Sequence, residues 1–61
     1  MWRYVHTLDN KVWINQDMVS QIEQVSSDVV AVYFNDGRRL EIWENYDDLL
    51  KDWGIIQSIS R

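Results

Sequence analysis

A chain of 61 residues holds one domain at most, and its 46% of hydrophobic residues favours a folded core over disorder. The formal net charge of −4 disfavours nucleic acid and anionic membrane surfaces as partners, because both attract lysine and arginine. The absence of cysteine and the single histidine, His6, exclude disulfides, thiolate metal sites and zinc sites built on several imidazoles.

The N-terminal half of the chain predicts three short strands. Residues 2–8 alternate between two faces with the period of two that is typical of a strand. Asp9-Asn10 predicts a turn, because both residue types tolerate positive φ, and residues 11–15 form the returning strand. A bend at Asp17-Met18 leads into residues 19–25, whose apolar spacing fits a helix about as well as a strand; we expect a strand.

A hairpin and then a helix are predicted for the C-terminal half. Residues 29–34 are rich in β-branched and aromatic side chains, and residues 38–43 form the return strand. Between them lies Asn35-Asp36-Gly37, the strongest turn signal of the chain, in which Gly37 supplies a positive φ. The period then changes: apolar residues of the segment 46–53 recur at i, i+3, i+4 and i+7, the stripe of an amphipathic helix.

Both ends of this helix are marked in the sequence. Asn45 is the expected N-cap, and Gly54 fits the position just after the helix. The tail over residues 54–61 is apolar from 55 to 59, and packing on the sheet and pairing with another chain both stay open for it. We therefore predict a single α+β domain over residues 1–61, mostly β: a small antiparallel meander of about five strands followed by one C-terminal helix.

We find no catalytic or metal site in the sequence. His6 is the only imidazole, and none of the serines lies in a nucleophile motif, so no nucleophile–histidine pair is indicated. The acidic residues late in the chain match no calcium-loop spacing. We therefore expect a protein that is not an enzyme, needs no cofactor and acts by binding.

The aromatic residues are the main candidates for a binding surface. If the aliphatic residues of the strands face the core under the helix, then Trp13, Tyr33 and Trp43 share the opposite face of the sheet. Such a face needs a second layer, and a homo-oligomer interface and a stacking pocket for a planar ligand both stay open. The candidate interface or ligand-binding residues are Trp2, Tyr4, His6, Trp13, Tyr33 and Trp43.

Two sets of charged residues are secondary candidates. The candidate anion contacts are Arg3, Arg38 and Arg39. Acidic residues around the start of the helix form a row that is typical of a solvated face and that can also dock a basic partner. The candidate acidic docking face consists of Glu44, Asp47, Asp48 and Asp52.

The chain also resembles a bacterial family. Residues 8–19, LDNKVWINQDMV, followed by QIE at 21–23, are similar to a pattern of the flagellar FlbD and swarming-motility SwrD family. Residues 28–39 resemble the hairpin of that family, and residues 42–45, IWEN, resemble its lead into a helix. Gln16 departs from the pattern, which usually has proline there, and four tryptophans are unusual for it. The resemblance implies a small cytoplasmic bacterial protein linked to flagellar motor function, with no catalytic residues to carry over.

Two functions are therefore predicted as alternatives. The first is a bacterial or phage interaction module that forms a homo-oligomer and binds a protein partner. The second is a module that binds or sequesters a small planar anionic ligand, such as a nucleotide signal, through aromatic and arginine side chains. The identity of the partner, the oligomer size and the host process stay open.

We expect a cytoplasmic protein that does not enter a membrane. Residues 1–4 lack the apolar run of a signal peptide. No stretch of the chain approaches the roughly 20 consecutive apolar residues that a membrane-spanning helix needs.

Overall fold

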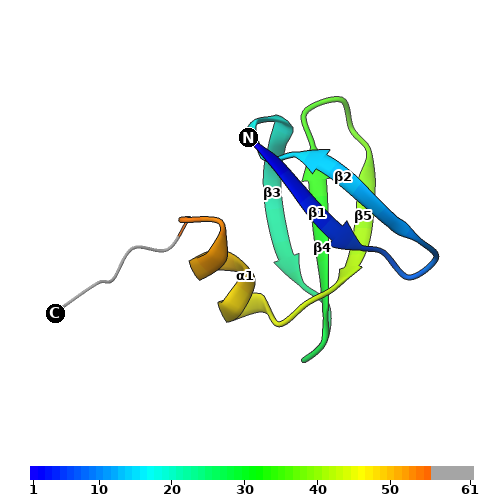
Figure 1. The fold of residues 1–61 in the computed structure, drawn as a ribbon, viewed down its shortest axis with the longest axis vertical. Coiled ribbons are helices and arrows are strands. Elements are labelled where there is room, and N and C mark those ends of the chain that lie inside the picture. The colour runs from blue at the N-terminus through cyan, green and yellow to red at the C-terminus, as the bar shows by residue number, and fades with distance from the viewer. Residues whose placement is uncertain (56–61) are drawn as a thin grey trace, which may run out of the picture.

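The computed structural model describes residues 1–55, which form five antiparallel strands and one α-helix (Figure 1). In chain order the elements are β1 (Trp2–His6), β2 (Lys11–Asn15), the 3-10 turn η1 (Gln16–Met18), β3 (Val19–Gln24), β4 (Val29–Phe34), β5 (Arg39–Trp43) and α1 (Tyr46–Asp52). The predicted α+β fold, mostly β with a C-terminal helix, is confirmed. Residues 56–61, which hold most of the predicted apolar tail, lie outside the described residues.

The strands form two sheets rather than one continuous meander. β1 and β2 pair as a hairpin, and β3, β4 and β5 form a second sheet in that order. The hairpin crosses over one face of the three-stranded sheet (Figure 1), so the apolar faces of the two sheets cover each other. A bridge between Thr7 and Ile42 joins β1 to β5 where the sheets meet. The second layer that the sheet requires is thus supplied by the first hairpin of the same chain.

The core lies between the two sheets and is closed on one side by α1. Its buried side chains are Val5, Ile14, Val30, Val32, Phe34, Ile42, Leu49, Leu50 and Trp53. The stripe predicted for residues 46–53 is confirmed, since its leucines and tryptophan are buried and Tyr46 packs at the rim. No polar side chain is buried within residues 1–55, so burial of apolar surface is the main stabilising term.

The first turn differs from the prediction in place and in mechanism. β1 ends at His6 rather than at Leu8. The Thr7 hydroxyl accepts hydrogen bonds from the backbone N–H groups of Asp9 and Asn10 at 3.1 and 2.8 Å, which turns the chain there. No non-glycine residue within 1–55 has a positive φ, so a side-chain cap replaces the positive-φ turn expected from the Asp-Asn pair.

The tight turn between β4 and β5 is confirmed. Gly37 has φ +93°, and although the space around it is open, any side chain there would be strained by that angle. β5 begins at Arg39, one residue later than predicted, because the N–H of Arg38 bonds to Asp36 Oδ1 at 3.0 Å within the turn. β3 ends at Gln24, one residue earlier than predicted.

α1 is capped at both ends by the residues that the sequence indicates. The Asn45 side chain accepts a hydrogen bond from the N–H of Asp48 at 3.0 Å. Gly54 has φ +71°, and its N–H and that of Ile55 donate to carbonyls of the last turn at 3.1 and 2.9 Å. α1 ends one residue earlier than predicted and has seven residues. Across residues 1–55, no helix has the length and apolar character needed to cross a membrane.

Gln16 ties the hairpin to the helix, a role that no pattern in the sequence indicates. Its Oε1 accepts a hydrogen bond from Arg3 Nε at 2.7 Å, and its Nε2 donates to the Trp53 carbonyl at 2.9 Å. This carbonyl lies at the C-terminal end of α1, where backbone acceptors lack helical partners and where a cation is favoured. The two bonds therefore hold β1, η1 and α1 in one arrangement.

Gln16→Ala should lower the free energy of unfolding by about 1–3 kcal/mol, because it removes two hydrogen bonds, one of them to a charged group. Urea denaturation followed by tryptophan fluorescence measures the change. Gln24→Ala, at an exposed position of β3, is the control and should change the free energy by less than about 0.5 kcal/mol. Equal stability of wild type and Gln16→Ala would contradict this role.

Candidate functional site

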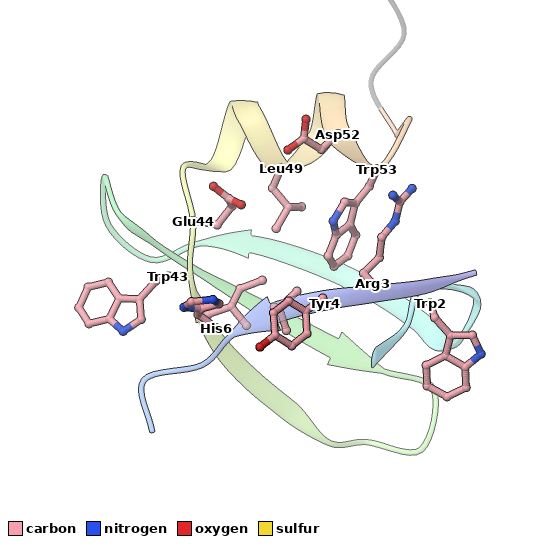
Figure 2. A pocket seen from close by; sticks show the side chains of 11 residues that line it. Trp2, Arg3, Tyr4, His6, Trp43, Glu44, Leu49, Asp52 and Trp53 are labelled. Atoms are coloured by element: carbon pink, nitrogen blue, oxygen red, sulfur yellow. The ribbon is translucent and has the colours of Figure 1, made fainter. Parts of the chain in front are cut away.

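A set of ring side chains lies on the outside of the hairpin and at the adjoining end of β5. We call it the aromatic strip: Trp2, Tyr4, His6, Trp13 and Trp43. Tyr4 is central, with its ring centroid 5.1 Å from that of Trp13 and 5.9 Å from that of His6. The bridge between the two sheets sets His6 opposite Trp43, and Figure 2 shows both at one end of β1 with Trp2 at the other. The strip therefore continues from the hairpin onto the second sheet.

Strand alternation puts these side chains outside. Val5 lies between two members of the strip and is buried, so its neighbours in β1 point the other way. The exposed fractions of Trp2, Trp13, Trp43 and Tyr4 are 63, 63, 55 and 52%. Single exposed apolar residues are ordinary on a protein surface, whereas a contiguous set of this kind is typical of an interaction site.

Tyr33 shares the outer face of the three-stranded sheet with Trp43, as expected, but it lies at the other end of that face and is not part of the strip. It lies in β4, opposite Arg39 of β5, while Trp13 belongs to the other sheet. The Tyr33 hydroxyl donates to Glu23 Oε1 at 2.9 Å and accepts from Arg39 Nε at 3.0 Å. Alternation along a strand gives its parity but does not say which strands share a sheet, and this is why the prediction was wrong for Trp13.

The three candidate anion contacts are not brought together. Arg3 is half-buried beside α1, whereas Arg38 and Arg39 lie where the β4–β5 hairpin turns. Arg38 Nε lies 2.8 Å from Asp36 Oδ2, and Arg39 Nη1 lies 2.8 Å from Glu41 Oε2. Such exposed ion pairs are weak, so each arginine can exchange its carboxylate for another anion.

A groove between β2 and the turn of the β4–β5 hairpin joins two of these arginines to the strip. Its volume is about 520 Å³, and its lining includes Trp2, Trp13, Phe34, Arg38 and Arg39. We call it the arginine groove. Its volume suits a small ligand, and its side chains combine aromatic faces with positive charge.

A different groove lies between β1 and α1 (Figure 2), and we call it the β1 groove. Its volume is about 490 Å³. All five residues of β1 line one side, and Leu49 and Asp52 of α1, with Trp53 just after the helix, line the other. Sequence reasoning missed this groove, because a strand edge becomes available only once the order of the strands is known.

The predicted acidic docking face divides into two parts. Glu44 and Asp52 line the β1 groove. Asp47 and Asp48 lie outside it, in the first turn of α1, where negative charge complements the helix dipole. The expectation of a solvated acidic face thus fits the second pair, while the first pair belongs to a concave site.

The charged and aromatic side chains of these sites do not form a metal centre. Across residues 1–55 no three His, Asp or Glu side chains gather closely enough to hold a metal ion. The strip and the two grooves present rings, apolar carbons and separated charges, a combination suited to holding a partner or ligand in place.

Comparison with known proteins adds no identity. No protein-family model, curated protein or solved structure matches the chain. The resemblance to the FlbD and SwrD family therefore stays a prediction.

The turn that carries Arg38 provides a titration test. The backbone N–H of Arg38, and then its guanidinium, bond to the Asp36 carboxylate and hold the pKa of Asp36 below its ordinary value. The resulting contribution to stability is present at neutral pH and is lost as the pH falls through the lowered pKa. In Arg38→Ala the pKa of Asp36 should rise yet stay below its ordinary value, because the backbone donor remains. Carboxyl NMR titration measures it, and a complete return to the ordinary value would contradict the main-chain cause.

Proposed function

We propose that this protein is a non-enzymatic interaction module that self-associates through the aromatic strip and also binds a protein partner. The observation that carries the proposal is the exposure of neighbouring tryptophan and tyrosine rings on one outer surface. The occupant of the strip is a second copy of this chain, and area and charge both support that choice.

The area of the strip approaches what a dimer needs. Its tryptophan and tyrosine side chains leave on the order of 500 Å² exposed. A standard interface buries roughly 800 Å² per partner, so the strip supplies more than half of that share. Tryptophan and tyrosine are also the residue types that carry most of the energy in interfaces. In a two-fold arrangement the same strip meets itself, and the assembly closes.

Charge on the hairpin supports contact between two copies. β1 and β2 contain no aspartate or glutamate, although the whole chain carries a net charge of −4. Two copies can therefore bring their strips together without placing carboxylates of these strands opposite each other. Burial of the strip also adds apolar contact to a small domain that has no disulfide.

Trp13→Ser should weaken self-association by at least about 30-fold, because a central tryptophan contributes 2 kcal/mol or more to an interface. Trp13 is 63% exposed and is not part of the core, so the fold should survive. Native mass spectrometry and sedimentation equilibrium over a range of concentrations report the oligomer. Val25→Ser, which removes an exposed apolar side chain from the β3–β4 connection, is the matched control and should leave the oligomer intact.

Two results would contradict this assignment. One is a wild-type protein that stays monomeric at the highest concentration measured. The other is an oligomer that forms equally well with Trp13→Ser, because its interface would then lie elsewhere. Circular dichroism of both variants checks that any loss of assembly is not a loss of fold.

A second candidate function is the binding of a small planar anion in the arginine groove. The observation that favours it is a groove of about 520 Å³ that joins Trp13 to Arg38 and Arg39. A purine can stack on the indole while its phosphate takes the place of the carboxylate partner of Arg38. This ligand and a second copy would both use Trp13, so the two functions compete for one ring.

Titration with ADP should then quench tryptophan fluorescence to saturation. The double variant Arg38→Ala and Arg39→Ala should bind ADP more than about tenfold more weakly, because each substitution removes a charge-assisted hydrogen bond to the phosphate. Lys51→Ala, which removes one cation from the exposed face of α1, is the control. The absence of quenching at millimolar ADP would eliminate this second candidate.

A further inference from the structure

We propose that the β1 groove binds an extended segment of a partner protein that carries a lysine or arginine and adds to β1 as a further strand. The inference rests on the proposed function, since it takes the protein to be a protein-binding module, and it names the chemistry of the partner. The groove overlaps the aromatic strip, because Trp2, Tyr4, His6 and Trp43 line it as well, whereas Trp13 belongs to the strip alone.

The edge of β1 that faces away from β2 presents unpaired backbone groups. Gln16 N–H donates to the Met1 carbonyl at 2.7 Å. Because bonded positions alternate in an antiparallel pair, the odd-numbered residues of β1 are the ones that bond to β2. The N–H and C=O groups of Trp2 and Tyr4 then point to the opposite edge, and within residues 1–55 no strand pairs with them there. Such a row of donors and acceptors is a template for strand addition.

α1 forms the opposite wall of the groove and gives it apolar contacts. Leu49 and Trp53 line this wall, and the buried Ile42 of β5 also lines the groove. The groove follows the whole length of β1, and its volume of about 490 Å³ suits a short extended chain rather than a folded domain. Side chains of an added strand alternate in direction, so every second one would point toward this wall.

The charges of the groove favour a basic residue in the bound segment. Glu44 lies at the end where β1 reaches His6, and Asp52 lies on the rim formed by α1 (Figure 2). Within residues 1–55 neither carboxylate takes part in a salt bridge. Arg3 lies toward the other end of the groove, where it bonds to the turn η1. A lysine or arginine near Glu44 would therefore meet a carboxylate that has no cationic partner.

Selection from a phage-displayed library of random octapeptides on the immobilised full-length protein tests the inference. Enriched peptides should contain lysine or arginine flanked by alternating apolar residues, and they should lack proline at their centre. A synthetic copy of the most enriched peptide then serves as the probe in fluorescence polarisation. Enrichment of acidic or proline-rich sequences, or no enrichment at all, would overturn the proposal.

A double substitution that replaces both carboxylates by uncharged amides tests their role. Glu44→Gln together with Asp52→Asn should weaken probe binding at least tenfold and reduce its dependence on salt. The glutamine keeps an oxygen that can accept the hydrogen bond from Asn45 N–H. Asp9→Asn together with Asp47→Asn is the matched control, because it removes two charges from exposed positions outside the groove and should change affinity less than twofold. An equal loss of probe affinity in the two double variants would overturn the role of the groove.

Strand addition is tested on the backbone itself. Tyr4→Pro removes an N–H that points into the groove and spares the N–H groups that bond to β2. It should bind the probe about tenfold more weakly than Tyr4→Ala, which loses the same ring and keeps the N–H. Should Tyr4→Pro fail to fold, probes N-methylated at alternate positions make the same test from the peptide side. Undiminished binding of every methylated probe would overturn strand addition.

Trp13→Ser separates this inference from self-association. It should give a monomer that binds the probe within twofold of wild type, because Trp13 does not line the groove. Probe binding by a wild-type protein that never self-associates would remove the strip proposal and support the groove. Self-association without any probe binding would support the strip proposal and overturn the groove inference. Probe binding that needs Trp13 but neither Glu44 nor Asp52 would place the peptide on the strip and overturn the inference.

Discussion

The apolar face of the β1–β2 hairpin packs against the apolar face of the three-stranded sheet, and the other features of the molecule depend on this contact. A domain of 61 residues buries only about 60% of the surface that its unfolded chain exposes. A helix of seven residues alone is too short to cover one continuous sheet of five strands. Folding the first hairpin over the other three strands lets Val5 and Ile14 meet Val30 and Val32, and α1 then needs to close only one side.

This packing also explains why so many rings lie outside. With both inner faces occupied by aliphatic side chains, strand alternation leaves Tyr4 and Trp13 on the outer face of the hairpin. The bridge between Thr7 and Ile42 then bends the outer surface of one sheet into that of the other, so that His6 comes opposite Trp43. The aromatic strip is therefore a consequence of how the hairpin is folded over the sheet. Its composition and continuity are what make it suited to a second copy.

The same arrangement leaves one strand edge open beside the helix. β1 pairs with β2 on one side and meets β5 only at its end, so most of its second edge faces α1 across a groove. Gln16 holds this geometry, because it joins Arg3 of β1 to the C-terminal end of α1. The outer rings and the open edge of β1 are thus two neighbouring sites on one strand, and Trp2, Tyr4 and His6 belong to both.

The sequence by itself determined the strands, the helix and their ends, because these depend on interactions between residues close together in the chain. The turn at Gly37, the cap at Asn45, the helix stop at Gly54 and the stripe over residues 46–53 all depend on residues a few positions apart, whose backbone angles and caps are set by their neighbours. The outward direction of each ring followed from alternation in the same way. Only the tertiary structure decided which strands share a sheet, and with it the separation of Tyr33 from the strip and the open edge of β1. Strand pairing joins distant residues, and a strand keeps the same alternation whichever sheet it enters, so no local pattern distinguishes one sheet from two.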